Sequence, residues 1–192
     1  MKCDICPWWL GYLLVNPLRR RLQDPVAILG PHVRDGMTVI EPGPGMGFFT
    51  LDLARLVGPH GRVVCVDVQQ KMLDALRKRA GKIGMQDRIE TRLARDGGLG
   101  IDDLSGLADF VMAFAVVHEV PDGARFFREA YAALKPGGRM MLSEPAHHVS
   151  DEAFAATLAH AEHAGFRVEE RSASRAGRTA LLEKPKPSQD AS

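Results

Sequence analysis

The stretch Val39-Ile40-Glu41-Pro42-Gly43-Pro44-Gly45-Met46-Gly47-Phe48 decides the fold of this chain. It lies where an apolar run suited to a strand gives way to a segment of helical period. Glycines at such a junction let a ligand approach the backbone and the first N–H groups of the helix. Asp67 ends the next apolar run, about 20 residues after Gly47, where a carboxylate can bind ribose hydroxyls. The stretch therefore predicts a site for a cofactor that contains a nucleoside.

Outward from this loop, short apolar runs alternate with segments of helical period, which predicts an α/β fold with a mostly parallel sheet. The expected strands are residues 38–40, 62–66, 89–93, 110–115, 140–143, 166–171 and 179–183. The expected helices are residues 48–57, 70–82, 121–134 and 151–164. A turn around Ala176-Gly177 predicts a closing antiparallel hairpin.

Length and composition indicate one packed domain, since 192 residues with 45% hydrophobic side chains match ordinary globular usage. We assign it to residues 1–184, with an N-terminal segment 1–36, a core 37–184 and a flexible tail 185–192.

Charge and patterning exclude several partners. The 25 Lys and Arg nearly balance 24 Asp and Glu, so no nucleic acid partner is expected. The longest apolar runs, 8–15 and 110–117, are far shorter than the roughly 18 residues of a membrane span. Arginines follow the first run, in the wrong order for a secretory signal, and three cysteines build no disulfide framework. We therefore expect a cytoplasmic protein.

The details of the glycine loop favour S-adenosylmethionine over a dinucleotide. The dinucleotide fingerprint is Gly-x-Gly-x-x-Gly, whereas the glycines here stand at 43, 45 and 47, with Glu41 ahead of them. That acid would repel a pyrophosphate, but it suits the ammonium and sulfonium charges of S-adenosylmethionine. A dinucleotide-dependent oxidoreductase is therefore the weaker interpretation.

On these residues the chain resembles the class I S-adenosylmethionine-dependent methyltransferases, particularly the small ubiquinone/menaquinone-biosynthesis-like branch, over about residues 20–184. Residues 41–47 match the family's glycine-rich first motif, and Asp67 matches its ribose-binding acid. The stretches His118-Glu119-Val120-Pro121-Asp122 and Leu134-Lys135-Pro136-Gly137-Gly138-Arg139 are also typical of it. The resemblance implies a Rossmann-like seven-stranded sheet in the order 3-2-1-4-5-7-6, sandwiched by helices, with an N-terminal helical lid.

The resemblance also implies a set of cofactor-binding residues: Glu41, Gly43, Gly45, Gly47, Asp67, Val68, Asp96 and Ala115. One position departs from the family pattern. The family usually has Gly-Asp after the third strand, where the acid accepts a hydrogen bond from the adenine amino group. This chain has Ala94-Arg95-Asp96, so we carry Asp96 over as an acid displaced by one position.

The candidates on the acceptor side follow from the chemistry of methyl transfer. In-line displacement at a sulfonium needs alignment, exclusion of water and, for a weak nucleophile, a base. Such groups gather outside the carboxyl ends of parallel strands, which makes His118, Glu144 and His147 catalytic candidates and His148 a substrate contact. A histidine can accept the proton of a phenol, enol or hydroxyl. The alternative is that His118 only orients its loop and that the other two histidines are a solvated pair.

The N-terminal segment carries Trp8, Trp9 and Tyr12 before the core. The resemblance suggests a lid over the cofactor, in which Trp8 and Tyr12 contact the substrate. Packing on the sheet and a weak contact with a membrane surface are the alternatives. Cys3 and Cys6 form half of a zinc-type pair without a second half, so we expect no metal site, and a redox-sensitive thiol pair remains open.

The sequence therefore predicts an S-adenosylmethionine-dependent methyltransferase that acts on a small-molecule acceptor by in-line methyl transfer. The alternative from a different class is a catalytically inactive cofactor-binding module that docks to a partner through its tryptophans.

Overall fold

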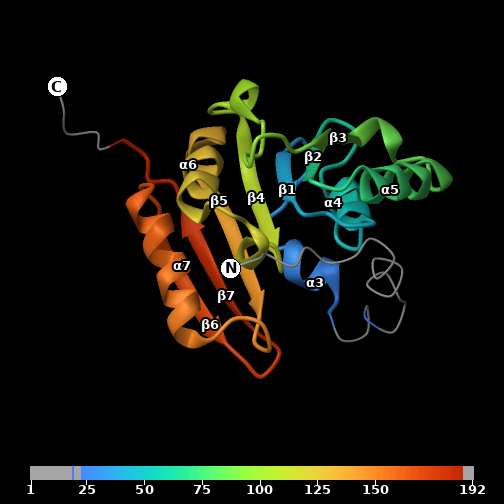
Figure 1. Ribbon diagram of the computed structural model, residues 1–192. Helices are drawn as coiled ribbons and strands as arrows, with labels where there is room; N and C mark the ends of the chain where they lie inside the picture. The colour runs from blue at the N-terminus through green and yellow to red at the C-terminus, as the bar shows by residue number, and fades with distance from the viewer. Residues whose placement is uncertain (1–18, 20–22, 188–192) are drawn as a thin grey trace. The chain divides into compact units, whose positions relative to one another are not determined.

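The computed structural model of the chain describes residue 19 and residues 23–187 (Figure 1). Its strands form a seven-stranded sheet in the order β3-β2-β1-β4-β5-β7-β6, as the resemblance implied. Strand β7 is antiparallel to β5 and β6, while the pairs β1 with β2, β2 with β3 and β4 with β5 are parallel. The chain divides after Asp96 into two compact units, which we call the first and the second unit.

The first unit carries the glycine loop. Its elements are α3 (Pro25–Leu29), β1 (Thr38–Pro42), α4 (Thr50–Leu56), β2 (Arg62–Asp67), α5 (Gln70–Lys82), a 3-10 turn η2 (Gln86–Arg88) and β3 (Ile89–Leu93). Strands β1 and β2 are buried along almost their whole length, as expected for parallel strands covered on both faces. Helix α5 packs on β2 and β3 and buries Met72, Leu73, Leu76 and Ala80, which recur at helical spacing.

The second unit carries the candidate acceptor side. Its elements are η3 (Asp102–Leu104), β4 (Ala108–Phe114), η4 (Val117–Glu119), α6 (Gly123–Ala133), β5 (Leu134–Pro145), α7 (Asp151–His163), β6 (Arg167–Ala173) and β7 (Gly177–Glu183). Helices α6 and α7 lie side by side (Figure 1). Asp122 and Ser150 cap them, since each side chain accepts a hydrogen bond from a backbone N–H in the first turn.

The observed elements differ from the predicted ones mainly at their ends. Helix α4 begins at Thr50 rather than at 48, because the chain is still turning through the glycine loop. Strand β5 begins at Leu134, where the sequence predicted the end of a helix. The register with β4 jumps from Ala108 opposite Leu134 to Phe110 opposite Arg139, so the intervening proline and glycines form a bulge inside the strand.

Among the residues that the structure describes, no helix has both the length and the apolar character needed to cross a membrane. Trp8, Tyr12, Cys3, Cys6 and the final residues 188–192 lie outside the described residues. The N-terminal lid, the thiol pair and the extent of the single domain therefore stay predictions.

Candidate active site

The glycine loop turns through three left-handed positions. Gly43, Gly45 and Gly47 have φ angles of 66°, 54° and 84°, a region that side chains other than glycine seldom adopt. The Gly43 N–H donates to the carbonyl of Val66 at 2.8 Å, which ties the loop to the end of β2. The three glycines of the predicted motif thus allow the left-handed backbone of the loop, as their spacing indicated.

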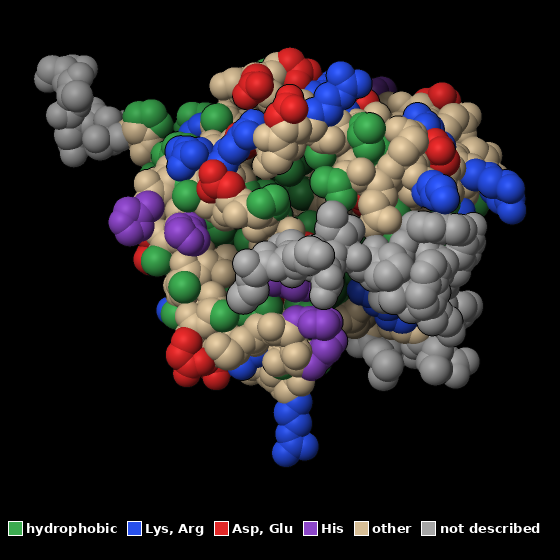
Figure 2. Space-filling model, viewed as in Figure 1, with side chains coloured by type: hydrophobic (Ala, Val, Ile, Leu, Met, Phe, Trp, Pro, Cys, Tyr) green, Lys and Arg blue, Asp and Glu red, His purple; other side chains and the backbone are tan. Residues whose placement is uncertain are grey.

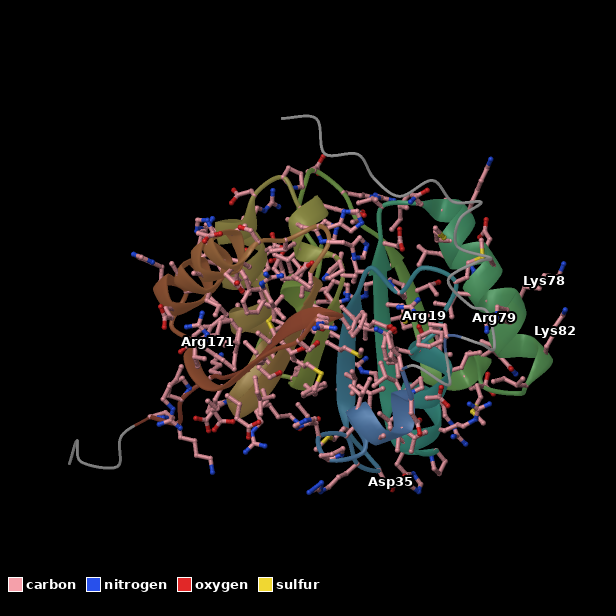
Figure 3. The ribbon with its side chains drawn as sticks, turned by 90° about the horizontal axis from the view of Figure 1, so that it is seen from below. Arg19, Asp35, Lys78, Arg79, Lys82 and Arg171 are labelled. Carbon is pink, nitrogen blue, oxygen red and sulfur yellow. The ribbon has the colours of Figure 1, made fainter. Side chains whose placement is uncertain are left out.

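Two of these glycines serve different purposes. A Cβ at Gly47 would lie 2.4 Å from the Leu76 side chain, so this glycine lets α5 pack against the loop. A Cβ at Gly45 would meet nothing within 4 Å, so the backbone there is open to a ligand. Two arginines, both labelled in Figure 3, brace the loop: Arg79 donates to the carbonyl of Met46, and the guanidinium of Arg19 lies 4.1 Å from the centroid of the Phe48 ring.

Acidic and apolar groups stand at the carboxyl ends of β2 and β3. Asp67 is 7% exposed, and its Oδ1 accepts the Gln69 N–H at 2.8 Å, which fixes the carboxylate at the end of β2. Val68 follows it and is 58% exposed. Asp96 lies beyond the end of β3 in an exposed left-handed turn, with a φ angle of 53°. The structure thus brings the predicted residues Asp67, Val68 and Asp96 to the carboxyl ends of neighbouring strands.

Glu41 lies deeper than the sequence suggested, because its carboxylate is turned into the core at the end of β1. It is 4% exposed, and its Oε2 accepts hydrogen bonds from the Thr50 hydroxyl at 2.6 Å and the Cys65 thiol at 3.8 Å. Burial raises the pKa of Glu41 to about 7; the two hydrogen bonds oppose this shift and the charge of Asp67 adds to it. Burial likewise raises the pKa of the Cys65 thiol.

In the second unit, the chain leaves β4 through a strained residue. Ala115 has a φ angle of 54°, which is uncommon for a residue with a Cβ, and its N–H donates to the carbonyl of Ser143 on β5 at 2.7 Å. Strain of this kind is typical of functional sites and is held by surrounding contacts. The turn that follows, η4, is thereby tied to the end of β5.

His118 and Glu144 form a hydrogen-bonded pair across this turn. Glu144 is 1% exposed; its Oε1 accepts the Val117 N–H at 2.8 Å, and its Oε2 lies 2.5 Å from His118 Nδ1. The hydrogen bond to Glu144 raises the pKa of His118. Burial opposes this shift, and the charges of Glu144 and Glu119 add to it. A pair of this kind can orient an imidazole and stabilise its protonated form.

The two other predicted histidines gather beside this pair. The His148 ring stacks on that of His118, with centroids 5.3 Å apart and planes 13° from parallel, and the His147 ring lies 4.2 Å from that of His148. Both are exposed. Figure 2 shows that histidine side chains, in purple, reach the surface of the molecule. Within the described residues, no three His, Cys, Asp or Glu side chains are placed to hold a metal ion.

Sequence reasoning missed the hydrogen-bond partners of the two buried glutamates. Thr50 and Cys65 hold Glu41, while the N–H of Val117 holds Glu144. No local pattern marks them, because the hydroxyl and the thiol come from separate elements and the N–H is a backbone group.

Comparison with known proteins identifies the family. The model of the methyltransferase domain family matches residues 33–183. The chain belongs to this methyltransferase family. It is 35% identical over 109 residues to an arsenite methyltransferase of Halobacterium salinarum, covering 57% of this chain and 27% of that protein. It is 33% identical over 112 residues to the ubiquinone/menaquinone biosynthesis C-methyltransferase UbiE of an Enterobacter species, covering 58% of this chain and 44% of that protein. The methyltransferase chain thus spans less than half the length of these curated relatives.

The solved structures of other methyltransferases confirm the predicted fold class. An S-adenosylmethionine-dependent methyltransferase from Aquifex aeolicus superposes with a TM-score of 0.82, at 22% identity, over 93% of this chain and 99% of that one. A second, from Methanococcus maripaludis, superposes with a TM-score of 0.77 at 17% identity, over 95% and 92% of the two chains. Family and fold together imply S-adenosylmethionine as the cofactor of this methyltransferase. The open backbone at Gly45 and the fixed carboxylate of Asp67 fit the nucleoside part of this cofactor.

Proposed function

We propose that this methyltransferase moves the methyl group of S-adenosylmethionine to a small-molecule acceptor. The observation that carries the proposal is the glycine loop, open at Gly45, in the same unit as the nearly buried Asp67 at the end of the next strand. When bound, S-adenosylmethionine supplies a methyl group made electrophilic by a sulfonium. The protein then has to bind the two reactants, align them for the transfer and exclude water.

The roles of the cofactor-binding residues follow from their positions. Asp67 accepts hydrogen bonds from the ribose hydroxyls, and exposed Val68 offers an apolar surface to the adenine. Asp96 is the acid that we assign to the adenine amino group. Glu41 is buried in the core at the end of β1, and because its pKa is raised to about 7 it carries only part of a negative charge at neutral pH. The backbones of Gly43, Gly45 and Gly47 complete the set within the first unit, and Ala115, in the second unit, is the remaining residue that the resemblance implies.

The acceptor is a small molecule rather than a nucleic acid, since the chain carries a net charge of only +1. One relative is named for arsenite and another for ubiquinone/menaquinone biosynthesis. Soft centres such as arsenic bind thiolates, but Cys65 is buried and its pKa is raised, which argues against a three-thiol site in this chain. An organic acceptor is therefore favoured. The sparse cysteines also support a cytoplasmic location.

Calorimetric titration of the full chain with S-adenosylhomocysteine, with NADH as the control ligand, tests this proposal. We expect micromolar binding of S-adenosylhomocysteine and none of NADH. Binding of neither ligand would favour the inactive interaction module, and binding of NADH alone would favour the oxidoreductase.

Asp67→Ala sharpens this test. It should weaken S-adenosylhomocysteine binding by about 1–3 kcal/mol, because two hydrogen bonds to a charged acceptor are lost. The matched control is Asp87→Ala, at an exposed position on η2, which should leave the affinity unchanged. An unchanged affinity in Asp67→Ala would remove the ribose assignment.

A further inference from the structure

The contacts of Glu144 point to a specific state of His118. Both oxygens of this carboxylate face donors from one short turn: Oε1 takes the Val117 N–H and Oε2 faces His118 Nδ1. An ionised carboxylate can only accept hydrogen bonds, so the 2.5 Å contact requires the hydrogen on Nδ1. Any exchange of a proton between His118 and a ligand therefore runs through Nε2.

The pair stands where ligands bind in this class of fold. His118 follows β4 and Glu144 ends β5, and these strands are parallel neighbours within the second unit. Ligands of open α/β sheets bind outside the carboxyl ends of the strands. The His118 side chain is 22% exposed, so the ring is held by the protein yet reaches the surface.

The charges around His118 favour the imidazolium that proton uptake would create. Glu144 lies at Nδ1, and Glu119 Oε1 lies 3.9 Å from Nε2. His148 stacks on the ring and His147 lies beside His148. Arg178 of β7 is in register with Glu144, but its guanidinium donates to Asp151 and to the carbonyl of Val149. Among the described residues, the carboxylate that is hydrogen-bonded to His118 Nδ1 is thus a buried one.

We propose that Glu144 holds His118 in its Nδ1-protonated tautomer, so that Nε2 takes the proton of a protic methyl acceptor such as a phenol, an enol or an alcohol. This inference rests on the proposed function. The acceptor's O–H bond breaks, and its proton goes to Nε2. An electron pair of the acceptor, on oxygen or on the enol carbon, forms the new bond to the methyl carbon, while the pair of the broken C–S bond stays on sulfur. His118 is then the catalytic residue, and Glu144 is a positioning residue.

This assignment narrows the class of acceptor. A thioether, a tertiary amine or arsenite attacks through a lone pair without breaking a bond to hydrogen, so it needs no imidazole base at the methyl transfer. A phenol or an enol is a poor nucleophile until it loses its proton, and general bases typically contribute about 10²–10⁴-fold to such steps. The pair therefore fits a protic acceptor.

Imidazole NMR of the ¹⁵N-labelled full chain tests the tautomer without an acceptor. With S-adenosylhomocysteine present, neutral His118 should carry its hydrogen on Nδ1, and its titration midpoint should lie above the ordinary histidine value. In Glu144→Gln the midpoint should fall toward that value. Glu162→Gln, at an exposed position on α7, is the matched control and should not move it. A hydrogen on Nε2, or a midpoint that Glu144→Gln leaves unchanged, would overturn the proposal.

Acceptor probes then test the class. Catechol, hydroquinone, dimethyl sulfide and arsenite are offered with S-adenosylmethionine, and release of S-adenosylhomocysteine is measured. We expect turnover with the phenols alone, a loss of kcat of about 100-fold in His118→Asn, and no loss in His163→Asn, an exposed position on α7. In Glu144→Gln the acidic limb of the pH profile of kcat should move to lower pH.

Methylation of arsenite or dimethyl sulfide that is insensitive to His118→Asn would overturn the proposal but leave the methyltransferase function standing. Failure of the wild type to bind S-adenosylhomocysteine would instead count against the proposed function, and the NMR result would still decide the pair.

Discussion

Glu41 and Glu144 occupy comparable places in the two units, yet their surroundings give them opposite roles. Each ends or nearly ends a parallel strand, and they are 4% and 1% exposed. In the described residues, Glu41 is hydrogen-bonded by a hydroxyl and a thiol, neither of which carries a positive charge. Glu144 accepts a hydrogen bond from a backbone N–H and another from an imidazole. The difference teaches that burial without a cationic partner favours the protonated acid at Glu41, whereas the imidazole beside Glu144 gives that carboxyl group a base to orient.

The largest effect is expected from breaking the second of these pairs. Glu144→Ala should lower the free energy of unfolding by about 4 kcal/mol, because it leaves the buried Val117 N–H without its acceptor and His118 without its carboxylate. Urea denaturation at pH 6 measures the change, with exposed Glu162→Ala as the control. A loss equal to that of the control would mean that the pair contributes nothing to stability.

The pH dependence of stability reports on the first of these acids. Because the pKa of Glu41 is raised from 4.5 to about 7 on folding, the folded state binds the proton more tightly. Its contribution is complete below pH 4.5 and is lost as the pH rises to 7, a decrease of about 3 kcal/mol. Glu41→Gln retains an oxygen that can accept from Thr50 and should flatten this part of the curve. Urea denaturation from pH 4 to pH 8 measures it, and an equal slope in both proteins would refute the shift.

His118 adds a related but later contribution. Its raised pKa stabilises the fold below the ordinary histidine value, and this stability disappears as the pH rises through the folded-state value. The wild type should therefore lose stability in two overlapping windows, and Glu144→Gln should reduce only the one that begins at the ordinary histidine pKa of 6.5. The same denaturation series measures both, and a loss of stability above pH 7 that Glu144→Gln leaves unchanged would contradict the comparison.

The smallest effect is expected from Thr50→Val, which keeps the shape of the side chain and removes the hydroxyl that holds Glu41. It should cost about 1 kcal/mol at neutral pH, the usual net value of one hydrogen bond. Since this hydrogen bond lowers the pKa of Glu41, its loss should also raise that pKa in the folded state. The pH range over which Glu41 costs stability should then extend to higher pH. The half-buried position Thr157, on α7, whose hydroxyl donates to the carbonyl of Ala153 away from any acid, provides the control Thr157→Val. If the upper end of this pH range is the same in Thr50→Val and the wild type, the hydroxyl does not interact with the ionised carboxylate.

The sequence predicted most of the fold because the local signals agree with one another. The run Gln70–Lys82 shows a clear helical period and became α5 with the predicted bounds, and Ile89–Leu93 became β3 in the same way. The boundary at Leu134 was wrong because the chain continues as a strand through a proline and two glycines, residues that normally end an element. Pairing with β4 overrides that local signal. Helix α3 is too short to be seen by periodicity.

The same distinction between local and tertiary signals applies to the candidate site. The sequence by itself determined the α/β class, the glycine loop, Asp67 and the histidines as candidates, because these depend on residue type and on spacing along the chain. Only the tertiary structure decided that Glu41 is buried against Thr50 and Cys65, and that Glu144 faces Nδ1 of His118. Burial and hydrogen bonding are set by groups that lie far apart in sequence, and these two properties determine whether a carboxyl group keeps its proton.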